Sequence, residues 1–102
     1  MITKKMYVVV RLDLSQTYRC VQGAHALAQF SKDYPKQVKL WNNQHLIFLC
    51  VCNLIELRFW VKKLQKVKKC FSSFYEPDLD DQLTAICCFD SGRIFKSLRL
   101  AP

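Results

Sequence analysis

Polar side chains that can bind an anion are concentrated between Arg11 and Arg19, where an apolar run meets a segment of small residues. The first amides of a helix have no partners within the helix, so a polar turn that leads into one favours a negatively charged ligand. The stretch therefore predicts an anion site. Its polar side chains are Arg11, Asp13, Ser15, Gln16, Thr17 and Arg19.

A second polar segment, Glu76 to Asp81, is the acidic exception on a basic chain. It holds four of the eight acidic residues. Its carboxylates can position or deprotonate a water molecule. The alternative is a solvated turn without chemistry.

The chain has a formal net charge of +8, and five lysines crowd positions 62–69. A domain this basic is expected near polyanions, with nucleic acid first and an anionic membrane surface second. We expect phosphate contacts from Arg11, Lys62, Lys63, Lys66 and Lys69. Lysines at the end of a helix also suit the helix dipole and the solvent, and this alternative stays open.

The pattern of apolar residues predicts one α/β domain over residues 1–102. Apolar runs predict strands at 5–12, 44–52, 70–75 and 82–89, and helices between them begin near Ser15 or Thr17 and near Asn53. The second helix is expected to end near Lys69. This order predicts a mixed four-stranded sheet in a three-layer α/β/α arrangement.

Two segments are less regular. Residues 31–43 are expected to form a frayed helix end and a connection, and residues 93–100 a short helix or an edge strand. Ligands of such sheets sit beyond the carboxyl ends of the strands. We therefore expect the Arg11–Arg19 turn and the Glu76–Asp81 loop to share one edge of the sheet.

The first apolar run is too short for a signal peptide or a membrane span, so we expect a cytoplasmic protein that does not enter a membrane. The six cysteines are then expected to be reduced and to act as small apolar residues. No cysteine pair has a histidine at ligand spacing, and we expect no metal or other cofactor.

Two motifs resemble the type-2 peptidyl-tRNA hydrolase family. Val-Val-Val-Arg-Leu-Asp-Leu at 8–14, followed by Val-Gln-Gly-Ala-His-Ala at 21–26, is similar to the strand, Arg-x-Asp turn and Gln-x-x-His-Ala helix of that family. Leu-Thr-Ala-Ile at 83–86 is similar to its threonine-bearing last strand. The resemblance spans nearly the whole chain and is closest to a short, divergent branch.

The resemblance implies a small α/β enzyme, commonly a homodimer without a required metal, that cuts the ester between a peptide and tRNA. It implies that Glu76 is the matching carboxylate, with Asp78 beside it. Gln22 and Thr84 would orient the ester, and Arg19 or Arg11 would stabilise the oxyanion. The implied catalytic residues are Arg19, Gln22, Glu76, Asp78 and Thr84.

The position of the family's catalytic lysine, four residues before Gln22, holds Tyr18 in this chain. Arg19 is the nearest cation, but an arginine stays charged and cannot carry a proton. Two hypotheses follow. The chain is either an active hydrolase of peptidyl-tRNA or a related aminoacyl ester, or a module of the same fold that only holds RNA or a protein.

Overall fold

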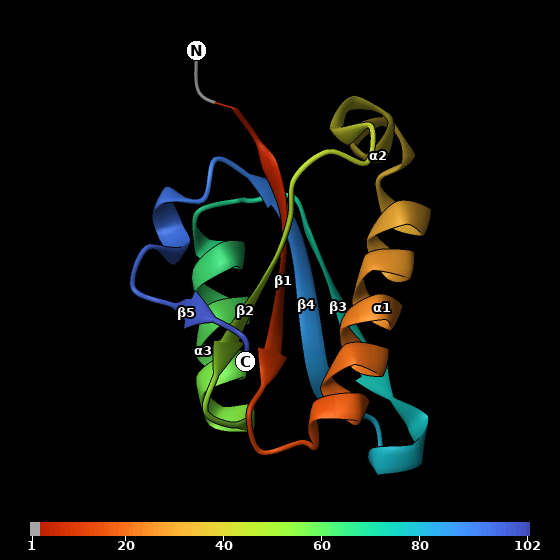
Figure 1. Ribbon diagram of the computed structural model, residues 1–102, viewed down its shortest axis with the longest axis vertical. Helices are drawn as coiled ribbons and strands as arrows, with labels where there is room; N and C mark the ends of the chain where they lie inside the picture. Colours follow the sequence, from red (N-terminus) through yellow and green to blue (C-terminus); the bar gives the residue numbers. More distant parts are fainter. Residues whose placement is uncertain (1–2) are drawn as a thin grey trace.

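A five-stranded mixed sheet with helices on both faces forms the molecule, as seen in the computed structural model, which describes residues 3–102 (Figure 1). The strand order is β3-β4-β1-β2-β5. The elements in chain order are β1 (Lys5–Arg11), α1 (Gln16–Asp33), α2 (Pro35–Trp41), β2 (Leu46–Val51), α3 (Leu54–Lys66), β3 (Phe71–Glu76), a 3₁₀ turn η1 (Pro77–Leu79), β4 (Gln82–Asp90), a 3₁₀ turn η2 (Arg93–Phe95) and β5 (Arg99–Leu100).

The centre of the sheet is β1, which runs parallel to β2 and antiparallel to β4. β3 pairs with β4 in the antiparallel sense, so it runs parallel to β1 and β2 but lies at the far edge. The α/β class and the mixed sheet are as predicted, but four strands were expected and there are five. The additional strand, β5, has two residues, which is too few for a periodic signal.

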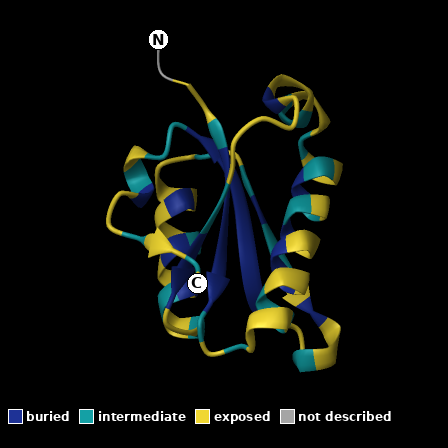
Figure 2. Ribbon diagram, in the orientation of Figure 1, coloured by how far each residue is buried: buried dark blue, intermediate teal, exposed yellow. Residues whose placement is uncertain are grey.

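Two apolar cores lie on opposite faces of the sheet, because alternate strand residues point to opposite sides. Met6, Val8 and Val10 of β1 pack beneath α1 and α2, whereas Tyr7 and Val9 pack against α3 and η2. Figure 2 shows the central strands as the most buried part of the molecule.

The small residues of α1 let this helix lie close to the sheet. A Cβ atom added to Gly23 would stand 2.4 Å from Cε2 of Phe48 and 3.2 Å from Cγ1 of Val8. Close approach therefore compensates the cost of a glycine within a helix, which is about 1 kcal/mol relative to alanine.

Side-chain caps begin both long helices. The Ser15 hydroxyl accepts a hydrogen bond from the amide of Tyr18 at 3.2 Å. The side-chain oxygen Oδ1 of Asn53 accepts one from the backbone amide of Glu56 at 3.0 Å, as a capping box predicts.

Two predicted boundaries are wrong. α3 ends at Lys66 rather than near Lys69, and Lys68 adopts a left-handed backbone. Residues 35–41, predicted as part of a connection, form α2, which begins at Pro35. Proline at the first helical position fixes a helical φ and needs no amide partner, so it starts this helix.

All six cysteines are free thiols, as predicted, but only three of them are buried as small apolar residues. Cys50, Cys87 and Cys88 are buried, whereas Cys20, Cys52 and Cys70 are exposed. No helix within residues 3–102 has the length and apolar character needed to cross a membrane.

Candidate functional site

A chain of three polar side chains joins α1, β3 and β4 at the edge of the sheet where β1 ends. The Thr84 hydroxyl donates a hydrogen bond to Oε1 of Gln22 at 2.5 Å, and Nε2 of Gln22 donates one to Oε1 of Glu76 at 2.8 Å. Gln22 and Thr84 are fully buried and Glu76 is 8 % exposed. The amide of Gln22 thus has one orientation, and it holds the carboxylate in a fixed position.

The carboxylate of Glu76 lies where β3 turns into η1. Its second oxygen accepts a hydrogen bond from the backbone amide of Asp78 at 3.3 Å. The hydrogen bond from Gln22 is the largest influence on the Glu76 pKa and lowers it. Partial burial opposes this, and the Asp78 amide, His25 and Tyr18 add to the lowering. Glu76 is therefore ionised at neutral pH and can hold a water molecule or a cationic group.

Tyr18, in the first turn of α1, lies close enough to Glu76 for its side chain to lower the pKa of that carboxyl. Burial raises the pKa of Tyr18, and the charges of Glu76 and Asp78 raise it further. The phenol thus stays protonated at neutral pH. It supplies a hydrogen-bond donor next to the carboxylate, at the sequence position where the similar family has a lysine.

His25, one helical turn after Gln22 on α1, lies near Glu76. Its ring stacks on Phe74 with a centroid distance of 4.4 Å and an interplanar angle of 6°. The histidine is exposed and lies close enough to Glu76 to lower the pKa of that carboxyl. It thus packs on β3 and lies close to the Glu76 carboxylate.

Arg11 ties the two polar segments together. Its guanidinium donates two hydrogen bonds to the carboxylate of Asp13, one to Oε1 of Gln82 at 3.0 Å and one to the carbonyl of Leu83 at 2.9 Å. Gln82 is the strand partner of Glu76. The turn after β1 and the Glu76 segment therefore meet at one edge, as predicted.

The same contacts place Arg11 differently from the prediction. The residue is 5 % exposed, and these contacts direct its guanidinium toward the protein rather than toward an incoming phosphate. Its ion pair lowers the pKa of Asp13, mainly through the hydrogen bond. Arg11 thus holds the start of β4, next to Glu76, in place.

Arg19 is not brought to Glu76. Its Nε donates to the carbonyl of Leu14 at 2.9 Å, and Nη1 lies 3.5 Å from the carbonyl of Pro102. The guanidinium therefore braces the β1–α1 turn against the C-terminal segment. Neighbouring residues of a helix point about 100° apart, so Tyr18 and Arg19 cannot both face Glu76.

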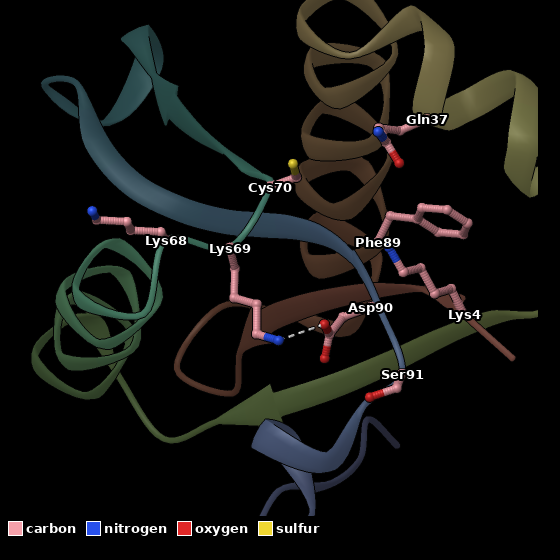
Figure 3. Close-up of a pocket in the computed structure, with 8 residues that line it drawn as sticks. All are labelled: Lys4, Gln37, Lys68, Lys69, Cys70, Phe89, Asp90 and Ser91. Atoms are coloured by element: carbon pink, nitrogen blue, oxygen red, sulfur yellow. Dashed lines mark hydrogen bonds and ion pairs between the residues drawn. The ribbon is translucent and has the colours of Figure 1, made fainter. Parts of the chain in front are cut away.

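The predicted phosphate-binding lysines do not form one cluster. Lys62, Lys63 and Lys66 lie exposed on α3, on the other face of the sheet from Gln22. Lys69 precedes β3 and so lies at the opposite end of the strands from Glu76. There it forms an ion pair of 2.9 Å with Asp90, beside a cavity of about 400 Å³ (Figure 3).

Tyr18 and His25 are the site residues that the sequence analysis did not assign. Tyr18, Gln22 and His25 are spaced four and three residues apart, which places them on one face of a helix. This spacing could have predicted that Tyr18 and His25 lie on the same side of the helix as Gln22. The stacking of His25 on Phe74 is a contact between α1 and β3, and the spacing of residues along the chain carries no signal for it.

No protein-family model matches the chain, and no curated protein matches it. We therefore infer the function from the geometry of these residues and from the charge of the chain.

Proposed function

We propose that the protein hydrolyses the ester between a peptide or aminoacyl group and tRNA. The observation that carries the proposal is the Thr84–Gln22–Glu76 chain of hydrogen bonds, with the Tyr18 hydroxyl beside the carboxylate. A fixed carboxylate next to a neutral hydrogen-bond donor is the minimum equipment for hydrolysis of an ester without a metal. We further propose that the α/β architecture is the three-layer type-2 peptidyl-tRNA hydrolase fold.

In the proposed reaction, Glu76 orients a water molecule and accepts its proton as the water oxygen attacks the ester carbonyl. Tyr18 donates a hydrogen bond to the oxyanion that forms. The bond between the carbonyl carbon and the ribose oxygen then breaks, and Glu76 gives the proton it took from water to the ribose oxygen. Because the Glu76 pKa is low, the carboxylate contributes chiefly by orienting the water rather than by strong basicity.

The charge of the chain supports an RNA substrate. The net charge of +8 favours a polyanion, and the exposed lysines of α3 can contact phosphates. The homodimer, the cytoplasmic location and the absence of a cofactor stay predictions. Light scattering coupled to gel filtration tests the dimer, because the mass of the chain is 12.0 kDa and a dimer has twice that value.

One observation favours a second candidate, a module that binds RNA without cutting it. A tyrosine replaces the lysine of the similar family, and Arg19 points to Leu14 and Pro102 instead of supplying a cation. In this candidate the Glu76 chain only ties α1 to the sheet.

A turnover assay on purified full chain with peptidyl-tRNA separates the two candidates. We expect release of the peptide, and a loss of about 100-fold or more in kcat for Glu76→Gln. Asp80→Asn is the matched control, because Asp80 is a nearby carboxylate in a left-handed turn that asparagine also adopts. Tight binding of tRNA without turnover would select the binding module.

A further inference from the structure

Three adjoining hollows follow the exposed side of α3 from its first turn to its end and to the edge strand β3. Their volumes are about 240, 290 and 550 Å³. Lys62 lines all three, Arg58 lines the first two and Phe59 lines the last two. Neighbouring hollows share these side chains, and we call the surface that lines the three hollows the α3 groove.

Aromatic rings and cations alternate along the α3 groove. Tyr75 is 52 % exposed in the first hollow, and Phe59 is 58 % exposed between the second and the third. Phe59 packs edge-on against Trp60, with a distance of 5.9 Å between the ring centroids. The cations that line the groove are Arg58, Lys62, Lys63 and Lys66, and Asp81 is the only acid among the described lining residues.

We propose that the α3 groove binds a single-stranded nucleic acid. Exposed aromatic rings stack on unpaired bases of any sequence, while cations beside them follow the phosphates. A duplex hides its bases and would leave the two rings unused. A second copy of this chain would bring Lys62 and Lys66 against the same cations, and the repulsion disfavours it.

The groove leads toward the candidate site. Tyr75 and Glu76 are consecutive residues of β3, and their side chains lie on opposite faces of the sheet. β3 is an edge strand, so a flexible strand that leaves the groove at Tyr75 passes round one strand to reach Glu76. Here the inference rests on the proposed function: the bound segment would be the unpaired end of tRNA that carries the ester.

Fluorescence anisotropy with a labelled single-stranded RNA oligonucleotide, and with the duplex of the same sequence, tests the groove on the full chain. We expect preference for the single strand. Phe59→Ala and Tyr75→Ala should each weaken binding by about 5- to 150-fold, which corresponds to the stacking of one base. Phe59→Trp should keep the affinity. Leu40→Ala is the control, because Leu40 is exposed on α2 outside the groove.

The salt dependence gives a second measurement on the same samples. Lys62→Ala and Lys66→Ala should each lower the slope of log K against log salt by about 0.7, as expected for one phosphate contact to a single strand. Unchanged binding by Phe59→Ala, or equal affinity for the duplex, would overturn the proposal. So would Phe59-dependent binding to anionic vesicles without binding to the oligonucleotide.

The outcome for the groove is separable from the outcome for the proposed function. Phe59-dependent binding of the single strand by a protein without esterase turnover supports the groove and rejects the hydrolase. Turnover by a protein whose binding of the single strand is unchanged in Phe59→Ala supports the hydrolase and rejects the groove.

Discussion

Gln22 and Glu76, which lie 54 residues apart in the chain, are joined by a hydrogen bond of 2.8 Å from the side-chain amide to the carboxylate. The other end of the same amide accepts a hydrogen bond from Thr84. Gln22 thus links α1 to β3 through Glu76 and to β4 through Thr84. The stability of the fold and the proposed chemistry of Glu76 therefore both depend on the Gln22 side-chain amide.

Replacing Gln22 by leucine should destabilise the fold. The change leaves Glu76 and Thr84 without their buried partner, and an unsatisfied buried polar group costs about 1–3 kcal/mol. Urea denaturation measures the difference in the free energy of unfolding. Gln29→Leu is the matched control, since the Gln29 amide bonds to Asp33 in an exposed position of the same helix. Equal stability of the two variants would contradict a structural role for the Gln22 chain.

The pH dependence of turnover should reflect the environment of Glu76. Because the hydrogen bond from Gln22 lowers the pKa of Glu76, activity should fall only below the ordinary carboxyl value of 4.5. In Gln22→Met the acid limb should move to higher pH, since the main lowering influence is gone. The measurement is kcat/KM against pH, corrected for spontaneous hydrolysis. An acid limb that does not move would mean that Glu76 is not the titrating group.

Replacing Tyr18 tests its hydroxyl directly. Tyr18→Phe removes the donor beside Glu76 and should lower kcat by about 100- to 1,000-fold, as the loss of one oxyanion donor does. The fold should be retained, because the ring is kept. Tyr18→Lys restores a cationic donor at this position and should recover part of the rate. A Tyr18→Phe variant with full activity would remove the phenol from the mechanism.

The ion pair between Lys69 and Asp90 should stabilise the fold only in a defined pH window. Burial raises the pKa of Asp90, but hydrogen bonds from Lys69 and the Gly92 amide outweigh this and lower it. The hydrogen bond to Asp90 raises the pKa of Lys69. The stabilisation from Asp90 is therefore present above its unfolded pKa of about 3.9 and is lost as the pH falls through the folded value.

Lys69→Met should accordingly destabilise the protein at pH 7 by about 1–3 kcal/mol, because it leaves a buried carboxylate without its cation. The difference from the wild type should shrink as the pH falls from about 3.9, where Asp90 of the unfolded chain is protonated, through the lower pKa of Asp90 in the folded protein. On the alkaline side, the contribution of Lys69 is lost as the pH rises through its raised pKa. Denaturation at several pH values measures this, with Lys66→Met on the exposed side of α3 as the control. A difference independent of pH would reject the ion pair as its cause.

Gly23→Ala should destabilise the contact between α1 and the sheet. The new Cβ would lie 2.4 Å from the Phe48 ring, and overpacking of this kind costs about 1–3 kcal/mol. The better helix propensity of alanine returns about 1 kcal/mol. Phe48→Leu shortens the obstructing side chain, so the double variant should be more stable than the two single effects predict. Strict additivity in thermal unfolding would mean that the two residues do not press on each other.

The sequence predicted the α/β class and the meeting of the two polar segments, because both follow from strand polarity and connection order. The close packing of α1 on the sheet depends on Gly23, where an added Cβ would meet the Phe48 ring. The directions of side chains within the site could not be predicted from the sequence. Arg19 was assigned to the reaction, yet Tyr18 faces Glu76, because the start of α1 at Gln16 decides which residue turns inward. Lys69 was grouped with the lysines of α3, although the chain leaves the helix at Lys66.

Alkylation of the buried pair Cys87 and Cys88 can report local unfolding of β4. Burial raises the pKa of both thiols, to about 12 for Cys88, so neither forms a reactive thiolate while β4 stays within the sheet. Exposed Cys20, Cys52 and Cys70 are available to an alkylating reagent throughout. Mass spectrometry of a labelling time course would therefore show early adducts at the exposed cysteines. Later adducts at Cys87 and Cys88 would measure how often the central sheet unfolds locally.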